Sequence, residues 1–459
     1  MRTPAKRLGP ILLAAAVAVG GAVHTAQAKP AAGPITLTVA YQKYTSGGPP
    51  PYWDDVFWKN MQSQLAAQHS NITLKLIPIN ASEGDYYTKI DLALRSASTA
   101  PDIVREDSFL IGSDVTAGYL LPLDKYLATW PEYAKEFYPG MQKITTFNGH
   151  NYGIMNGTDD RLVWYNKNVF KKAGLPTTWQ PHSWADILAA ARQIKAKVPG
   201  VIPLNCYSGI PMDEASTMQC FEMLLYGTPG GAPLYDYATK KWVVKSPGLT
   251  ATLKFIQTIY DPKNLLAPTN DIALAPNAGT IITQQLLPSD KLGIDIDGSW
   301  IPSTWVKGGA HPWPQWTTVM GHAKMPTEFG QAPHYVTLSG GWAYSISSRS
   351  KNPDAAFEVL KLANSRDNLA QYDVNVGNIG VRKDEVQVPV YSKLPLSDFT
   401  TGLLSFTQFR PGFPAYPKIS NQIDLAMENV MSGMSVADAA SAFQQAVTGI
   451  AGAANVETR

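Results

Sequence analysis

The chain has 459 residues, of which 38 are Lys or Arg and 36 are Asp or Glu. A hydrophobic fraction of 45% with 16% charged residues is ordinary for a globular protein and excludes a disordered chain. Because the length exceeds what one hydrophobic core usually serves, we expect two lobes. The near balance of charge, with no basic stripe along the chain, argues against a nucleic-acid partner.

Residues 1–28 have the three parts of a secretory signal peptide. Arg2, Lys6 and Arg7 form a basic start, residues 11–23 are apolar, and an Ala-Gln-Ala cleavage site follows. The apolar run is too short to cross a bilayer as a helix. Its removal would take away three basic and no acidic residues, so the mature chain would be close to neutral. No cysteine stands at the cleavage site to carry a lipid anchor, so we expect a periplasmic or secreted protein.

The first part of the mature chain alternates strand-like and helix-like segments. Apolar patterns predict strands at 35–42, 71–79 and 102–104, and helices at 53–68 and 86–97. This order requires parallel strands joined by right-handed crossovers. In such sheets a ligand binds beyond the carboxyl ends of the strands. The loops 42–51 and 105–109 are predicted to lie at that edge.

A charged cluster, Asp159-Asp160-Arg161, follows between two apolar, strand-like runs. Burying charges without partners is costly. The cluster is therefore either a solvated turn or the floor of a site. The second interpretation is favoured because binding sites concentrate at strand ends and lobe junctions.

Further elements are predicted beyond this cluster. Helical spacing indicates helices at 183–197, 216–226, 249–260 and 352–363, and amphipathic helices from about 419. Ser183 is placed to cap the first of these helices, and Pro199-Gly200 ends it. Strands are predicted at 292–297 and 336–345, with a hairpin-like stretch at 228–247. In the 336–345 run, Gly340 and Gly341 allow another part of the molecule to approach the backbone closely.

Several motifs occur in order along the chain: Ala-Pro-Asp-Ile at 100–103, Tyr-Asn-Lys at 165–167, Asp-Gly-Ser-Trp at 297–300, Gly-Gly-Trp at 340–342 and Pro-Ala-Tyr-Pro at 414–417. With these motifs the chain resembles the extracellular solute-binding proteins of ABC importers, in particular the maltose-binding-protein-like group. The resemblance covers essentially the whole mature chain. It implies an α/β, two-lobed periplasmic-binding-protein fold, with discontinuous lobes, a multi-strand hinge and a ligand cleft between the lobes.

The resemblance also implies where the chain crosses between the lobes, near 157–160, 323–326 and 364–368. The expected N-terminal lobe is 34–157 plus 325–365, and the expected C-terminal lobe is 160–322 plus 368–459. Hinge closure around a ligand is the expected motion.

Sugar recognition combines aromatic faces with planar polar groups that hydrogen-bond to hydroxyls. The resemblance places residues of both kinds at ligand-contacting positions. The expected aromatic contacts are Tyr44, Trp300, Trp342 and Tyr416, and the expected polar contacts are Glu106, Asp107, Asp159, Asp160, Arg161, Asp297 and Arg410, with Gly341 beside them.

These residues also have plainer interpretations. Trp300 and Trp342 can be core aromatics, and Tyr44 can be a loop residue without a role. Asp160 and Arg161 can neutralise each other as hinge supports. Asp107 can cap the turn that follows it, and Arg410 can pair with a surface carboxylate.

We expect a substrate-binding component that captures a mono- or oligosaccharide and delivers it to the permease subunits of an ABC importer. It would act as a monomer without a cofactor or a metal. The stretch around Asp159-Asp160-Arg161 carries more charge than the oligosaccharide-binding pattern at the same place. Arg161 therefore leaves an alternative, an anionic or polyol-type solute.

A secreted carbohydrate-active enzyme and a lectin-like adhesin are the competing classes. The chain has no G-x-S-x-G, P-loop or H-E-x-x-H motif. A glycoside hydrolase needs two carboxylates flanking one bond. On a strand, the adjacent Asp159 and Asp160 would point to opposite faces, which is poor geometry for that reaction. We therefore expect no enzymatic activity.

The only cysteines, Cys206 and Cys220, are 14 residues apart. Export from the cytoplasm permits a disulfide between them. Two buried thiols are the alternative, because spacing alone does not establish the geometry that a disulfide needs. No histidine spacing accompanies them, so they do not indicate a zinc site.

Overall fold

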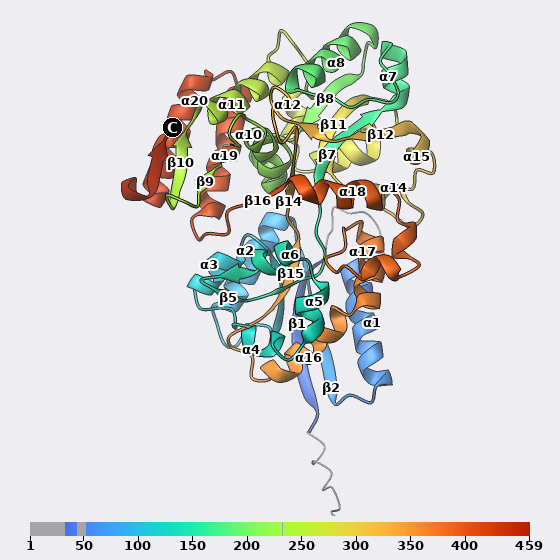
Figure 1. Ribbon diagram of the computed structural model, residues 1–459, viewed down its shortest axis with the longest axis vertical. Coiled ribbons are helices and arrows are strands. Elements are labelled where there is room, and N and C mark those ends of the chain that lie inside the picture. The colour runs from blue at the N-terminus through green and yellow to red at the C-terminus, as the bar shows by residue number, and fades with distance from the viewer. Residues whose placement is uncertain (1–32, 44–51, 232) are drawn as a thin grey trace, which may run out of the picture.

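The computed structural model of the protein describes residues 33–43, 52–231 and 233–459, which form two lobes (Figure 1). The first lobe, at the bottom of Figure 1, contains a five-stranded sheet with the order β2-β1-β3-β15-β6. Its strands are β1 (Ile35–Lys43), β2 (Ile72–Asn80), β3 (Ile103–Asp107), β6 (Ile154–Met155) and β15 (Trp342–Ile346). β1 pairs in parallel with β2 and β3, as predicted, whereas β15 runs antiparallel to β3 and β6.

Helices cover this sheet and supply most of its core. They are α1 (Trp53–Ala67), α2 (Glu83–Leu94), α3 (Ile111–Thr116), α4 (Asp124–Leu127), α5 (Pro131–Glu136), α6 (Pro139–Ile144), α16 (Pro353–Ala363) and α17 (Arg366–Val376), with a small hairpin of β4 (Thr146–Phe147) and β5 (His150–Asn151). In α1 the buried residues Phe57, Trp58, Met61 and Leu65 recur at helical spacing, so one face of the helix packs on the sheet.

The second lobe, at the top of Figure 1, is built on a four-stranded sheet with the order β12-β7-β11-β8. Its strands are β7 (Arg161–Asn166), β8 (Ile202–Cys206), β11 (Leu292–Gly298) and β12 (Met320–Ala323). All six residues of β7 are buried. Val163 and Tyr165 face one core, whereas Leu162 and Trp164 face a smaller one around Trp305, because successive side chains of a strand point to opposite faces.

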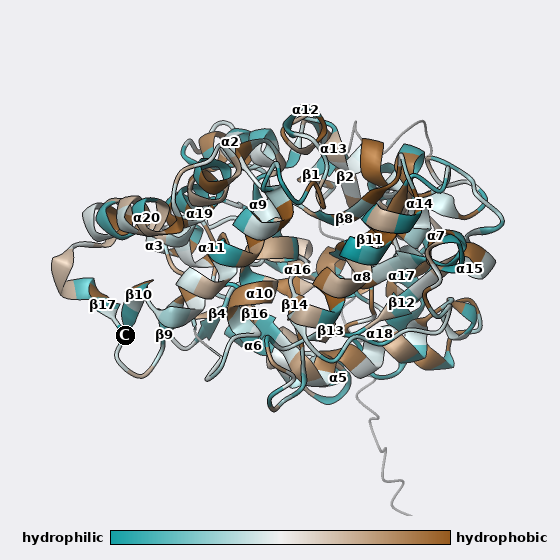
Figure 2. Cartoon of the chain, turned by 90° about the horizontal axis from the view of Figure 1, so that it is seen from above, coloured by the Kyte–Doolittle hydropathy of each residue, from teal (hydrophilic) through white to brown (hydrophobic). Residues whose placement is uncertain are grey.

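The helices of the second lobe surround this sheet on both faces. They are α7 (Lys167–Ala173), α8 (Trp184–Lys197), α9 (Glu214–Ser216), α10 (Met223–Tyr226), α11 (Pro247–Tyr260), α12 (Asn270–Ala273), α13 (Ala278–Thr280), α14 (Pro302–Trp305), α15 (Trp316–Val319), α18 (Ser397–Leu403), α19 (Tyr416–Met431) and α20 (Val436–Ala451). Ser183 caps α8, as predicted, and the structure shows that it does so in a reciprocal pair with Asp186. α11, α19 and α20 pack against one another, and their hydrophobic residues occupy only part of each surface (Figure 2).

Two small sheets complete the lobe. One joins β9 (Tyr235–Asp236), β10 (Lys241–Lys245) and β17 (Val456–Thr458), and the other joins β13 (Met325–Pro326), β14 (Tyr335–Ser339) and β16 (Thr407–Phe409). The hairpin predicted at 228–247 is the antiparallel pair of β9 and β10.

The strand expected at 336–345 is two strands in different lobes. β14 pairs with β16, and its Val336 and Leu338 belong to the core of the second lobe, whereas β15 lies in the sheet of the first lobe. The chain therefore crosses at Gly340-Gly341, and the crossing expected near 323–326 is wrong. A continuous apolar run does not show where its strand changes sheets.

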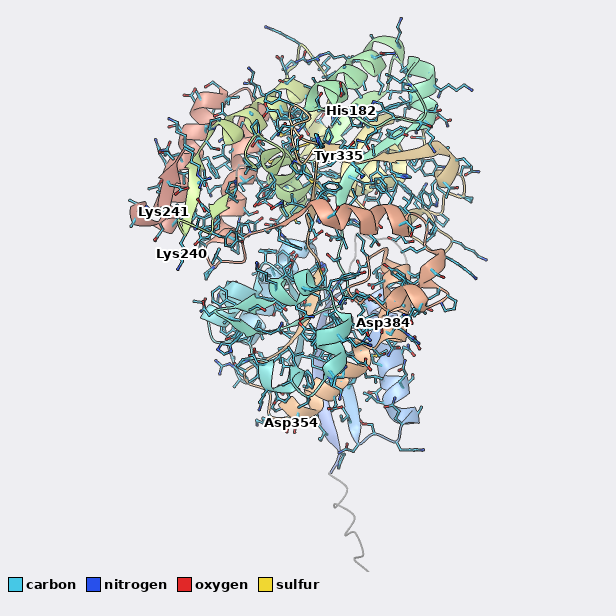
Figure 3. The ribbon with its side chains drawn as sticks, in the orientation of Figure 1. His182, Lys240, Lys241, Tyr335, Asp354 and Asp384 are labelled. Carbon is cyan, nitrogen blue, oxygen red and sulfur yellow. A yellow bond between two sulfur atoms is a disulfide. The ribbon has the colours of Figure 1, made fainter. Side chains whose placement is uncertain are left out.

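The third crossing also lies further along the chain than the expected 364–368. Leu369 and Tyr372 of α17, and Val381 after it, are part of the first core. Asp384 lies in the lower lobe, to which α17 also belongs (Figure 3). Contacts with the second lobe resume with Leu396 and Leu403. The amphipathic pattern of α17 predicted a helix, but it carries no information about which core the helix covers.

No helix in the described ranges is both long and apolar enough to cross a membrane.

Candidate ligand-binding site

The hinge brings strands from distant parts of the chain to backbone contact. The amide of Asn156 donates to the carbonyl of Trp342 at 3.0 Å, and Thr158 exchanges two backbone hydrogen bonds with Ile379, at 2.9 and 2.7 Å. Gly341 has a φ of +122°, and a Cβ there would lie 2.5 Å from the carbonyl oxygen of Gly157. Gly341 is thus required by the hinge itself, since only glycine fits both this conformation and this approach.

The charged cluster 159–161 lies at the hinge, and its three side chains differ in surroundings. Asp160 is fully buried and accepts a hydrogen bond from Ser339 Oγ at 2.9 Å. Its own amide donates to Ser299 Oγ at 3.1 Å. Burial raises the pKa of Asp160 well above its ordinary value. Asp160 therefore holds two crossing segments together and presents little to a ligand.

Asp159 is more accessible, with 17% of its side chain exposed. Its Oδ1 accepts from the amide of Gly340 at 2.8 Å and forms an ion pair with Nη1 of Arg161. Arg161 also donates to the carbonyl of Leu338 at 3.3 Å. The positive charge of Arg161 is thus matched by an adjacent carboxylate before any ligand arrives.

Each lobe also contributes a partly buried tryptophan near the hinge. Trp300 follows β11, and the guanidinium of Arg161 lies 4.9 Å from its ring centroid. Trp342 begins β15, and the guanidinium of Arg105 lies 4.1 Å from its ring centroid. An arginine thus covers part of each indole.

Arg410 connects the two lobes through buried ion pairs. Its Nη2 donates to Asp107 Oδ1 at 2.5 Å, at the end of β3, and its Nη1 donates to Glu214 Oε2 at 2.8 Å, in α9. All three side chains are at most 7% exposed. Asp107 also accepts from the hydroxyl of Tyr87 at 2.8 Å. Burial raises the pKa of Asp107, and Arg410 opposes that rise.

An aromatic ring from the first lobe is inserted beside this bridge. Phe109 is 3% exposed and belongs to the core of the second lobe. Its ring lies 5.5 Å from that of Tyr416 and 5.4 Å from that of Tyr87, in edge-on arrangements. The guanidinium of Arg410 lies 4.2 Å from the centroid of Phe109. The lobes are therefore closed on each other along this side.

Three residues that we expected to contact the ligand have side chains that point into the interior of a lobe. Tyr416 is fully buried and donates to Glu214 at 3.2 Å and to Glu222 at 3.4 Å, so it is a core aromatic of the second lobe. Asp297 accepts from Tyr207 Oη at 3.1 Å and from the amide of Gly298 at 2.6 Å, and burial raises its pKa to about 6.

Glu106 is the third expected ligand contact whose side chain points into the interior. It is fully buried inside the first lobe near Asp114, because it points to the opposite face of β3 from Asp107. Burial raises the pKa of Glu106, and it raises that of Asp114 to about 7. Tyr44 lies outside the described residues.

Sequence reasoning missed several residues of this region. Glu214 and Met218 approach the two arginines, with Met218 Sδ 3.4 Å from Arg161 Nη2. Met218 lies in the helix predicted at 216–226, whose apolar pattern did not indicate a site, and Glu214 lies just before that helix. Asn156 is 1% exposed, and neither polar atom of its amide has a hydrogen-bond partner in the structure. Its position between a buried strand and the charged cluster is the sequence feature that could have indicated Asn156 as a site residue.

Cys206 and Cys220 are joined by a disulfide with a Cα–Cα distance of 5.2 Å. The bond ties the end of β8 to the helical stretch that carries Glu214 and Met218. Among the described residues, no three or more His, Cys, Asp or Glu side chains are arranged to hold a metal ion.

Comparisons with known proteins agree with this architecture. Residues 45–370 match the family described as "Bacterial extracellular solute-binding protein". A protein of Brucella abortus (strain 2308), named only as a binding protein, is 25% identical over 415 residues, which are 89% of this chain and 90% of that one.

Two solved structures share the fold. An ABC transporter solute-binding protein from Thermotoga lettingae TMO, bound with α-D-tagatose, has a TM-score of 0.74 at 23% identity and covers 90% of this chain and 99% of its own. The GacH receptor of Streptomyces glaucescens GLA.O, solved unliganded and with acarbose, has a TM-score of 0.73 at 22% identity and covers 90% of this chain and 98% of its own. With the family match spanning well over half of its length, the chain belongs to the bacterial extracellular solute-binding protein family.

Proposed function

We propose that the protein binds a neutral sugar or polyol outside the cytoplasmic membrane and delivers it to the permease of an ABC importer. One observation carries the choice of ligand. Asp159 is partly exposed at the hinge, where each lobe also contributes a partly exposed indole, while Arg161 and Arg410 are already paired with carboxylates. Ligand hydroxyls can donate hydrogen bonds to an exposed carboxylate, and the apolar faces of a sugar ring can stack on indoles.

The charge of the region argues against the anionic alternative. Arg161 is paired with Asp159, and Arg410 is paired with both Asp107 and Glu214. An anion would have to displace one of these carboxylates and leave it unpaired in a buried place, which is costly. The ligands of the similar structures, tagatose and acarbose, also support a sugar over an anionic solute.

The proposal includes no chemical step. Asp160 is buried in the hinge, so it is not placed to act with Asp159 on one bond. We further propose that residues 1–28 are removed on export, and that the protein acts as a monomer that meets no nucleic acid. Recovery of the ligand unchanged after long incubation, checked by mass spectrometry, tests the absence of catalysis.

The main test is a thermal-shift screen of the mature protein, followed by calorimetry of the hits. The panel holds neutral monosaccharides, oligosaccharides, alditols, sugar acids and sugar phosphates. A ligand that binds only the folded protein raises its melting temperature by mass action. Hits among neutral compounds are expected, and hits confined to anions would overturn the proposal.

Asp159→Asn connects the binding to the site. Asn keeps the shape but loses the charged acceptor, whose hydrogen bonds contribute about 1.5–3 kcal/mol each. We therefore expect binding to weaken by at least tenfold while the fold is kept. Asp384→Asn is the matched control, because Asp384 also pairs with a buried arginine, Arg382, away from the cleft. Equal effects of the two substitutions would contradict the role of Asp159.

A further inference from the structure

We propose that the cleft is a single-unit site, which takes one monosaccharide or one acyclic polyol and rejects longer saccharides. Phe109 and Arg410 close one end of the cleft, and Trp300 with Gly377 close the other. The inference rests on the proposed function and adds to it the size of the ligand and the residues that limit it.

The first end is sealed by contacts between the lobes at both side-chain and backbone level. Asp107 and Phe109 from the first lobe meet Arg410 of the segment that enters the second. Close by, a Cβ on Gly112 would lie 2.0 Å from the carbonyl oxygen of Gly412, so α3 and this segment touch through their backbones. A saccharide cannot pass between segments in backbone contact.

A second row of contacts extends this closed end of the cleft, which we call the wall. A Cβ on Gly84, in the first turn of α2, would lie 2.7 Å from Oδ2 of Asp213 in the second lobe. Asp213 has a φ of +47° although it is not glycine, a conformation that persists where surrounding structure holds it. The seal therefore runs from α2 through β3 to α3.

The wall stands directly beside the candidate ligand contacts. The Cβ position of Gly340 would lie 3.2 Å from Arg410 Nη2 and 3.6 Å from Asp159 Oδ1. Both groups are thus within 4 Å of one point. A sugar hydrogen-bonded to Asp159 meets the Arg410 wall with its own ring and has no room for a second unit on that side.

The other end is limited by α17 and the chain after it. A Cβ on Gly377 would lie 3.0 Å from the carbonyl oxygen of Trp300 and 3.1 Å from Cβ of Ser303. A cavity of about 40 Å³ lies beside this contact, lined in part by Ser299, Ser303 and Asn378. It has room for a water molecule or two but not for a sugar ring. A longer ligand has no continuation in this direction.

The wall resists displacement because its charges are paired and buried. Moving Arg410 would separate it from Asp107 and Glu214 and leave buried charges without partners. Moving Phe109 would expose an aromatic ring that now lies in the core of the second lobe. A disaccharide that extends past Asp159 on this side would have to do one or the other.

The test compares matched ligands on the wild-type protein by calorimetry. Each series contains a monosaccharide, its alditol, and the di- and trisaccharides built from it, for glucose, galactose, mannose and xylose. We expect the preferred monosaccharide or alditol to bind at least tenfold more tightly than its di- and trisaccharides. Equal or tighter binding of the longer members overturns the single-unit site. Binding of no carbohydrate or polyol of any length overturns the proposed function instead.

Two variants test the wall itself. Phe109→Ala should raise the affinity ratio of disaccharide to monosaccharide at least fivefold, since it removes the ring that fills the closed end. Phe443→Ala is the matched control, because Phe443 is 4% exposed and belongs to the same core, but lies in α20. If Phe109→Ala fails to fold, Phe109→Leu replaces it. An unchanged ratio in the folded variant overturns the assignment of Phe109.

Discussion

The ion-pair bridge of Arg410 gives the sharpest prediction about how the two lobes are held together. In Arg410→Met the side chain keeps much of its length but loses both charge-assisted hydrogen bonds, to Asp107 and to Glu214. Removal of one partner from a buried ion pair costs about 3–5 kcal/mol, because the other partner remains buried and unpaired.

The structure favours the lower end of this range. Asp107 keeps a hydrogen bond from Tyr87, and Glu214 keeps those from Tyr416 and Ser420. Burial also raises the pKa of Asp107, which favours its uncharged form once Arg410 is gone. We therefore expect a loss of about 3 kcal/mol. At about 2–4 °C per kcal/mol for units of 150–250 residues, the melting temperature should fall by roughly 6–12 °C.

Small-angle scattering of the ligand-free protein supplies the second measurement. Because the bridge joins the lobes, its loss should increase the radius of gyration. Arg382→Met is the matched control: Arg382 is 2% exposed, pairs with Glu132 and Asp384, and lies over the ring of Phe137. It should lose comparable stability without a change in the radius of gyration.

An unchanged melting temperature in Arg410→Met would refute the energetic reasoning. The same radius of gyration in both variants would refute the claim that Arg410 holds the lobes together. Adding Asp107→Asn and Glu214→Gln to Arg410→Met should restore part of the stability, because no unpaired buried carboxylate remains at the bridge. The radius of gyration should stay increased, because the bridge itself is still absent.

Three further predictions concern other parts of the molecule. Trp300→Ala should weaken ligand binding at least tenfold, about 1.4 kcal/mol, through lost stacking area; an unchanged Kd in calorimetry would make Trp300 a purely structural support of Arg161. Burial raises the folded-state pKa of Asp114, beside Glu106, to about 7 from its ordinary 3.8. Its contribution to stability is therefore complete below about pH 4 and is lost as the pH rises to about 7. The melting temperature of Asp114→Asn should accordingly fall less than that of the wild type between pH 4 and pH 7, and parallel curves would contradict this. Replacing both Cys206 and Cys220 with Ser should cost about 3 kcal/mol, the value for a loop of about 15 residues, and denaturant unfolding without a change in midpoint would argue against it.

The sequence was sufficient wherever structure depends on local patterns. The period-2 apolar run at 35–42 became β1, and Ser183 caps α8 as its position indicated. The order of strands and helices fixed parallel pairing of β1 with β2 and β3. The strand and the helix cap depend on residues close to one another in the chain, and the parallel pairing follows from the order of the elements.

The candidate site was only partly predictable, because it depends on which way side chains point. Glu106 and Asp107 are neighbours on β3, and alternation placed them on opposite faces, but nothing in the sequence indicated which face was the cleft. The structure puts Asp107 at the lobe contact and Glu106 in the interior. Tyr416 matched a ligand-contacting position and is fully buried instead.

What the sequence by itself determined is therefore the order of strands and helices, through local periodicity, and the family of the protein, through the resemblance that its short motifs carry. Only the tertiary structure decided the partners of Arg410, which lie 303 and 196 residues away in the chain. It also decided that β14 and β15 belong to different lobes and that α17 covers the first core. The physical reason is that ion pairing and the choice of core depend on distances in space, which a one-dimensional pattern does not contain.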